Sequence, residues 1–108
     1  MPRLGSLIIN IYNCQDLIPG DSDGKSDPFI KATYFGQTAK TDVINESLNP
    51  IYNTRLVLEA IPVFNIKDNP PPLVLKVFDD DMMSHDFLGV VVVDLKEMFN
   101  KGHLKLNP

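Results

Sequence analysis

The sequence predicts an all-β domain, an antiparallel sandwich or barrel, and three observations support this prediction. Short segments rich in β-branched and aromatic residues recur along the 108 residues. Clusters of Gly, Pro, Asn and Asp separate these segments at regular intervals. The chain carries no internal repeat, and its length suits one domain spanning residues 1–108. Many short strands joined by such turns are typical of antiparallel sandwiches and barrels.

The first three strands are expected in the N-terminal half. Leu7–Tyr12 is β-branched and roughly alternating, and Phe29–Tyr34 follows an acidic segment. Gly36 tolerates positive φ, so we expect a turn there. This turn leads into Gln37–Ile44, a polar, Thr-bearing strand expected at the surface.

The remaining strands are expected after a loop that ends at Pro50. They are Tyr52–Ala60, Leu73–Phe78, Phe87–Val93 and His103–Leu106, with a short helical turn over Leu95–Asn100. Leu56 and Leu58 share one face of their strand. Leu73–Phe78 is the clearest buried strand, and the prolines at 70–72 before it cannot lie in a central strand.

The composition and charge of the chain disfavour several classes of function. Hydrophobic residues make up 44% of the chain and charged residues 22%, as in ordinary globular proteins. A net charge of -4 disfavours a nucleic-acid partner. Cys14 is the single cysteine, so no intramolecular disulfide forms and a cytoplasmic setting is expected. No signal peptide is recognised, and no apolar run approaches the roughly 20 residues of a membrane-spanning helix.

Seven of the fourteen acidic residues are concentrated in two short segments. The segments are Asp21–Asp27 and Asp79–Asp86, and each connects two expected strands. Like charges at this density repel one another. A hard cation with oxygen ligands from both segments would offset the repulsion, and Ca²⁺, which takes roughly six to eight oxygens, fits best. If both segments lie at one end of the sandwich, their carboxylates converge on one pocket.

Other interpretations of the acidic segments are less favoured. An EF-hand does not fit, because placing Gly24 at the glycine position of that loop puts Pro19 and Ile30 where carboxylates are required. Zn²⁺ would need Cys or His, and the few such residues are dispersed. Mg²⁺ is a weaker match than Ca²⁺. A solvated turn explains one acidic segment well, but explains two segments beside strands poorly.

Three motifs resemble the calcium-binding loops of C2 domains, in that family's order and spacing over nearly the whole chain. Leu17–Phe29, with its Ser-Asp-Pro-aromatic end, resembles the first loop. Leu48–Asn53 resembles the Leu-Asn-Pro-x-aromatic-Asn motif of the second loop, and Val77–Gly89 resembles the third. The resemblance implies an eight-stranded antiparallel Greek-key β-sandwich of C2 type, with Ca²⁺-dependent docking to phospholipid.

The resemblance also implies a set of calcium ligands. These are the carboxylates of Asp21, Asp27, Asp79, Asp81 and Asp86, with the backbone carbonyl of Asp80 and the hydroxyl of Ser84 as additions. Asp23 falls at a variable position and is expected to be a peripheral charge. Asp81 and Asp86 are five residues apart, where many members of the family have six. This shorter loop is expected to weaken or rearrange the site nearest Asp86.

The strand count also departs from the family pattern. The chain begins at the strand that leads into the first loop, which resembles the permuted form whose closing strand is C-terminal. It stops where that final strand would be expected. The strand is then missing from this chain or supplied by another one, and the domain is otherwise expected to be a monomer.

Membrane contact is expected from residues beside the acidic carboxylates. Met82 and Met83 would insert into the acyl boundary, or else fold back onto the sandwich. Lys25 is the third expected contact. A phosphoinositide site on a strand face is a weaker candidate, with Lys31, Lys40 and Arg55 as its cations.

These observations together predict a Ca²⁺-dependent module that binds anionic phospholipid. It would target a host protein to membranes, and would be peripheral at the membrane once Ca²⁺ is bound. The alternative is a C2-type protein–protein interaction domain in which Ca²⁺ is structural or absent. No catalysis is expected, because the sequence shows no activated nucleophile and no Gly-rich phosphate loop.

Overall fold

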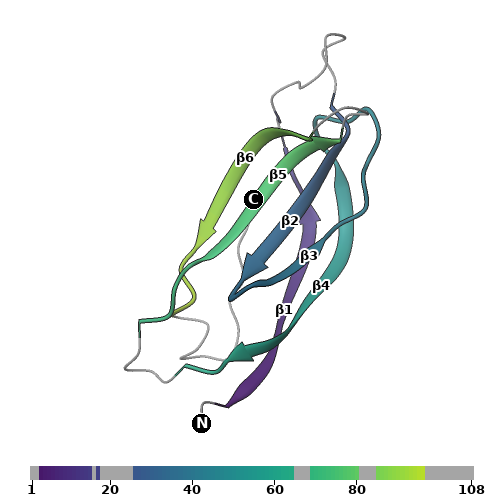
Figure 1. The fold of residues 1–108 in the computed structure, drawn as a ribbon. Coiled ribbons are helices and arrows are strands. Elements are labelled where there is room, and N and C mark those ends of the chain that lie inside the picture. Colours follow the sequence, from purple (N-terminus) through teal and green to yellow (C-terminus); the bar gives the residue numbers. More distant parts are fainter. Residues whose placement is uncertain (1–2, 16, 18–25, 65–68, 81–84, 97–108) are drawn as a thin grey trace.

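The structure, a computed structural model, describes residues 3–15, 17, 26–64, 69–80 and 85–96. Six antiparallel strands in this part of the chain form two sheets, which lie face to face as two layers (Figure 1). The strands are β1 (Leu4–Asn13), β2 (Pro28–Tyr34), β3 (Gln37–Lys40), β4 (Ile51–Pro62), β5 (Leu73–Asp80) and β6 (His85–Val93). The all-β fold class is confirmed. The expected strand His103–Leu106 lies outside the described residues.

The two sheets differ in width. In the described part of the chain, β1 and β4 form a two-stranded sheet, and the second sheet has the order β3-β2-β5-β6. Both sheets are antiparallel throughout. In β1, β2, β4 and β5, buried residues largely alternate with more exposed ones, so one face of each of these strands packs in the core and the other faces solvent.

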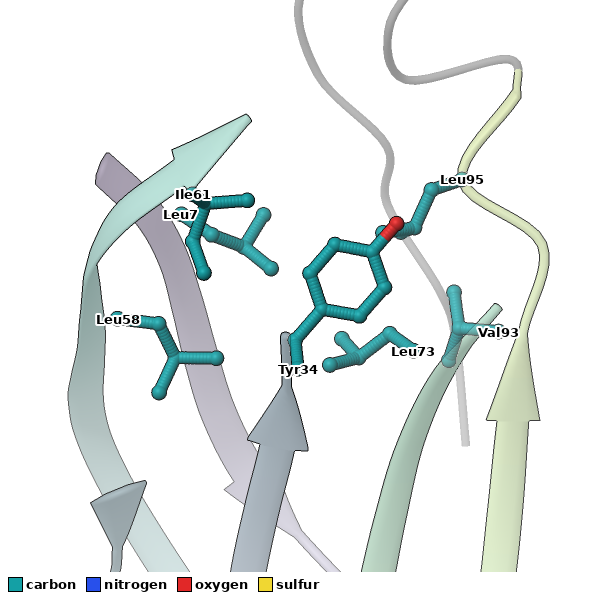
Figure 2. Close-up of a cluster of buried hydrophobic side chains, with 7 residues drawn as sticks. All are labelled: Leu7, Tyr34, Leu58, Ile61, Leu73, Val93 and Leu95. Carbon is teal, nitrogen blue, oxygen red and sulfur yellow. The ribbon is translucent and has the colours of Figure 1, made fainter. Parts of the chain in front are cut away.

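Buried side chains between the sheets form two clusters. The first contains Leu7, Tyr34, Leu58, Ile61, Leu73, Val93 and Leu95 (Figure 2). In this cluster the Tyr34 ring lies between the layers, and its hydroxyl donates to the Pro71 carbonyl at 2.7 Å. Burial raises the pKa of Tyr34, so the hydroxyl stays a donor. The second cluster contains Ile11, Ile30, Ala32, Leu56 and Val77.

One end of the sandwich gathers the strand ends that adjoin the acidic segments. There β1 and β5 finish and β2, β4 and β6 begin, with Asn13 opposite Ile51 and Pro28 opposite Asp79 (upper end of Figure 1). We call this the acidic end. The second core cluster lies nearer to it than the first, because its residues are closer in sequence to these strand ends.

Several strand boundaries differ from the prediction, and two of these differences affect the acidic end. β3 ends at Lys40 instead of continuing to Ile44. The reason lies at Thr41, whose side-chain hydroxyl accepts the Ile30 N–H at 2.9 Å. This bond takes the place of the backbone bond that would continue the β2–β3 ladder. The second acidic segment is also less of a loop than expected. Asp79 and Asp80 pair with Asp86 and His85 and extend the β5–β6 ladder.

β4 carries two bulges, and each contains a residue with positive φ. Asn53 (φ 42°) lies in the bulge near the acidic end, and Ala60 (φ 57°) lies in the bulge opposite Ser6. Asn tolerates the left-handed region, whereas Ala is strained there by its Cβ. Bulges of this kind normally use glycine at the left-handed position.

Ala60→Gly is therefore expected to raise the free energy of unfolding by about 0.5–1 kcal/mol, because relief of the Cβ strain exceeds the entropy cost of glycine. Urea unfolding measures this change. Ala32→Gly is the matched control, because Ala32 is fully buried in the middle of β2. That control should destabilise by about 1 kcal/mol. Equal losses from both variants would show that the bulge stores no strain.

Candidate metal centre

Asp79 is a carboxylate buried at the acidic end. It continues the inward alternation of Leu73, Leu75 and Val77 along β5, and its exposed fraction is 0%. Its Oδ1 accepts the Asp27 N–H at 2.7 Å. Its Oδ2 is buried and has no hydrogen-bond partner among the described residues. Leaving a buried acceptor unpaired lowers the folding free energy gained by about 1–3 kcal/mol, and a charged acceptor costs more. A ligand that binds this oxygen would remove that cost.

Asp27 is held from two directions. Its carbonyl accepts the Asp80 N–H at 2.9 Å, which completes a reciprocal pair of bonds with the end of β5. Its side-chain Oδ1 accepts the Glu46 N–H at 2.6 Å. Residues that are 52 positions apart, Asp27 and Asp79, are thereby fixed side by side. The two acidic segments therefore meet at one end of the sandwich, where the backbone of Asp27 contacts the carboxylate of Asp79 and the N–H of Asp80.

The loop before β4 supports this arrangement, a role that the sequence did not indicate for Glu46. Glu46 adopts φ 52°, and this conformation accompanies its N–H bond to Asp27. The next amide, of Ser47, donates to the Ser26 carbonyl at 2.8 Å, and Ile44 N–H donates to the Pro28 carbonyl at 3.1 Å. The segment around Asp27 is therefore clamped by residues 44–47 on one side and by β5 on the other.

The Leu-Asn-Pro motif anchors the chain that precedes the first acidic segment. The Pro50 carbonyl accepts the Cys14 N–H at 3.0 Å, and the Leu48 carbonyl accepts the Leu17 N–H at 2.9 Å. Tyr52 completes the support, because its hydroxyl donates to the Pro28 carbonyl at 2.7 Å. Burial, with the Cys14 thiol contributing, raises the pKa of Tyr52 and keeps it a donor.

Cys14 itself is half-buried and packs against the second core cluster. Burial raises the pKa of its thiol, so the unreactive protonated form dominates at neutral pH. This cysteine is a packing residue.

The structure places only part of the expected ligand set. Asp27, Asp79 and Asp80 come together, and the backbone of Asp86 lies opposite Asp79 in the ladder. The expected ligands and membrane contacts that lie outside the described residues are Asp21, Lys25, Asp81, Met82, Met83 and Ser84. Within the described part of the chain, no three His, Cys, Asp or Glu side chains form a group that could hold a metal ion.

The outer face of the four-stranded sheet carries a row of lysines. Lys40 on β3 pairs with Lys31 on β2, which pairs with Lys76 on β5. We call these three residues the lysine row. Lys31 and Lys40 were expected together, but the expectation that Arg55 joins them is wrong. Arg55 lies on β4 in the other sheet, where its Nε donates to Asn10 Oδ1 at 3.4 Å.

Lys76 was not predicted from the sequence, although one feature of the sequence could have identified it. It is the only charged residue among the first six positions of β5, and the alternation of that strand directs it outward. Lys31 and Lys76 become neighbours only through the β2–β5 register.

An aromatic row lies between the lysine row and the acidic end. The rings of Phe29 and Phe78 stack at 5.6 Å between centroids, and Phe78 meets Phe87 edge-on at 6.1 Å. Lys40 Nζ lies 5.9 Å from the Phe29 ring centroid. Beside this row is a pocket of about 270 Å³, whose lining is Phe29, Lys40, Thr41, Asp42, Val43 and Asp80. The lysine row thus adjoins the acidic end.

Over the described residues, no helix is both long and apolar enough to span a bilayer.

Comparisons with known proteins agree with this geometry. Mouse extended synaptotagmin-1 is 35% identical over 106 residues, which cover 91% of this chain and 9% of that protein. Human protein piccolo is 33% identical over 120 residues, which cover 97% of this chain and 2% of that protein. The chain thus spans less than a tenth of the length of these relatives.

A solved structure extends the likeness to the backbone. A calcium-bound structure of two C2 domains of extended synaptotagmin 2 matches with a TM-score of 0.77 and 29% identity, over 94% of this chain and 38% of that one. The C2 domain family model matches residues 5–107. The fold, the motifs and these matches lead to one conclusion: the chain belongs to the C2 domain family.

Proposed function

We propose that this domain binds Ca²⁺ at the acidic end and thereby docks on anionic phospholipid membranes. The observation that carries the proposal is the buried Oδ2 of Asp79, an acceptor without a partner among the described residues. Hard cations such as Ca²⁺ take carboxylate and carbonyl oxygens, and the donors at this end are of that kind. The likeness to a calcium-bound C2 structure points in the same direction.

The ligand set proposed is the one that the sequence suggested. Asp27 and Asp79 form its described part, and Asp21, Asp81 and Asp86 would add carboxylates. The Asp80 carbonyl and the Ser84 hydroxyl would supply the remaining protein oxygens. Because backbone hydrogen bonds already hold Asp27 against Asp79, the cation needs little rearrangement of this pair.

Charge inversion would couple the cation to the membrane. Without Ca²⁺, the carboxylates at the acidic end repel a negatively charged leaflet. Each bound Ca²⁺ adds two positive charges and reverses the local potential. Lipid and Ca²⁺ then strengthen each other's binding, since a headgroup oxygen can complete the coordination of the ion. Met82, Met83 and Lys25 would add contacts beside the ion. The domain would be peripheral, and we assign it no catalytic role.

A second contact with anionic headgroups is favoured by the lysine row. Three lysines paired across β3, β2 and β5 present one cationic stripe on the outer face of the sheet. Each lysine near an anionic surface contributes about 1 kcal/mol. This stripe would strengthen membrane binding without belonging to the cation site, and phosphoinositides are the headgroups that it suits best.

The cation site is tested by Asp27→Asn and Asp79→Asn. Each should lower Ca²⁺ affinity by about tenfold or more and remove Ca²⁺-dependent binding to vesicles of phosphatidylcholine and phosphatidylserine. Co-sedimentation in Ca²⁺ and in chelator measures the binding. Glu59→Gln is the matched control, because it removes the same charge at the far end of β4. Undiminished binding by both Asn variants would refute the site. Ca²⁺ uptake without vesicle binding by the unmodified protein would favour a protein partner instead.

Asp79→Asn should also raise the free energy of unfolding of the metal-free protein by about 1 kcal/mol. The amide keeps the acceptor for the Asp27 N–H and removes an unpaired buried charge. Urea unfolding in chelator measures this change. Asp79→Ala, which loses the acceptor as well, should be less stable than Asp79→Asn. A destabilised Asn variant would mean that burying the amide N–H groups costs more than removing the charge gains, and would contradict the prediction.

The lysine row is tested by combining Lys31→Gln with Lys76→Gln. This pair should weaken vesicle binding by about 30-fold, which corresponds to about 2 kcal/mol, and leave Ca²⁺ affinity in solution unchanged. Arg55→Gln is the control on the other sheet and should have little effect. If Arg55→Gln weakens vesicle binding as much as each lysine substitution does, the net charge of the domain determines vesicle binding and the position of the lysine row does not matter.

A further inference from the structure

β6 presents an apolar stripe on the outer face of the four-stranded sheet. Its members Val90 and Val92 pair with Lys76 and Val74, which point away from the core, whereas Val93 and Leu75 contact the core clusters. Phe87 is on the same outer side, because it meets the outward Phe78. The exposed fractions are 58% for Phe87, 50% for Val90 and 61% for Val92.

Such a stripe is unusual at this place in a sheet. β6 is the last strand of its sheet in the described part of the chain. Outward positions of antiparallel sheets that face water are normally polar, and edge strands are normally protected by charge. From Phe87 to Val93 the strand has no charged residue. The outer face of the other sheet also exposes Leu4, Ile8 and Tyr12, but there the polar pairs Ser6–Glu59 and Asn10–Arg55 lie between the apolar side chains.

The neighbours of the stripe indicate what covers it. Val90 lies directly across from Lys76, so the apolar stripe runs alongside the lysine row. A surface that is cationic on one side and apolar on the other matches an anionic bilayer, which offers phosphates and an acyl boundary together. A second copy of this chain would bring its own lysines, which repel those of the first.

The stripe is also continuous with the acidic end. Phe87 follows Asp86 directly, and its ring continues the aromatic row to Phe78 and Phe29. At about 3.3 Å per residue, Phe87 and Val92 are about 16 Å apart along the strand. Both can touch one bilayer together with the acidic end only if the strands are inclined towards the membrane plane.

We propose that Phe87, Val90 and Val92 are membrane-contacting residues, and that the domain docks with the β6 side of its outer sheet face against anionic lipid. This inference rests on the proposed function and adds an orientation to it. The acidic end would bind first through Ca²⁺, and the lysine row and the stripe would then hold the sheet face against the bilayer.

The test uses single cysteines in a Cys14→Ser background, labelled with a fluorophore that is sensitive to polarity. The test variant is Val92→Cys. The control is Val57→Cys, a comparable exposed valine (41%) on the outer face of the other sheet. Vesicles of phosphatidylcholine and phosphatidylserine are added with Ca²⁺ or with chelator. With Ca²⁺, the label at 92 should shift to the blue and become protected from an aqueous quencher, and the label at 57 should not.

A second measurement avoids the label. Val90→Thr with Val92→Thr keeps the side-chain shape and should weaken vesicle binding by about tenfold, with Ca²⁺ affinity in solution unchanged. Val57→Thr should leave vesicle binding unchanged.

The outcomes separate this inference from the proposed function. If the unmodified protein does not bind vesicles in Ca²⁺, both proposals fail. If it binds and the label at 92 stays in water, the orientation is wrong and the cation site stands. If the fluorescence of the label at 92 changes with protein concentration in the absence of vesicles, the stripe binds a second copy of the chain. This result would overturn the inference.

Discussion

The acidic end depends on the pair of hydrogen bonds between Asp27 and the end of β5. The Asp27 N–H donates to Asp79 Oδ1 at 2.7 Å, and the Asp80 N–H donates to the Asp27 carbonyl at 2.9 Å. These bonds continue the β2–β5 ladder beyond Pro28 and join the two acidic segments without help from an ion. They leave one oxygen of Asp79 buried and unpaired among the described residues. The free-energy cost of that oxygen is what a cation would relieve.

The same ladder determines the chemistry of both sheet faces. Alternation in β5 directs Leu75, Val77 and Asp79 inward and Lys76 and Phe78 outward. A register slip of one residue would exchange these two sets and destroy the core and the lysine row together. The two core clusters therefore hold the register, and the register holds the lysine row, the aromatic row and the stripe in place.

Departures from local sequence rules occur at both ends of the sandwich. At the acidic end the carboxylate of Asp79 is buried, and Glu46 and Asn53 adopt positive φ. At the other end Phe35 and Ala60 adopt positive φ. Glu46 N–H binds Asp27, whereas Asn53 and Ala60 each lie in a bulge of β4. The backbone strain at Glu46 thus accompanies a contact with a proposed ligand, and the strain at Ala60 does not.

The sequence by itself determined the fold class, the approximate positions of the six described strands and the concentration of carboxylates, because alternation and turn residues are local properties. It also singled out Asp27 and Asp79. Only the tertiary structure decided that β3 stops at Lys40, that Asp79 and Asp80 belong to the ladder, and that residues 44–47 clamp Asp27. It replaced Arg55 by Lys76 in the lysine row. The physical reason is that strand ends and cross-strand neighbours depend on pairing between segments far apart in the chain, which no local pattern encodes.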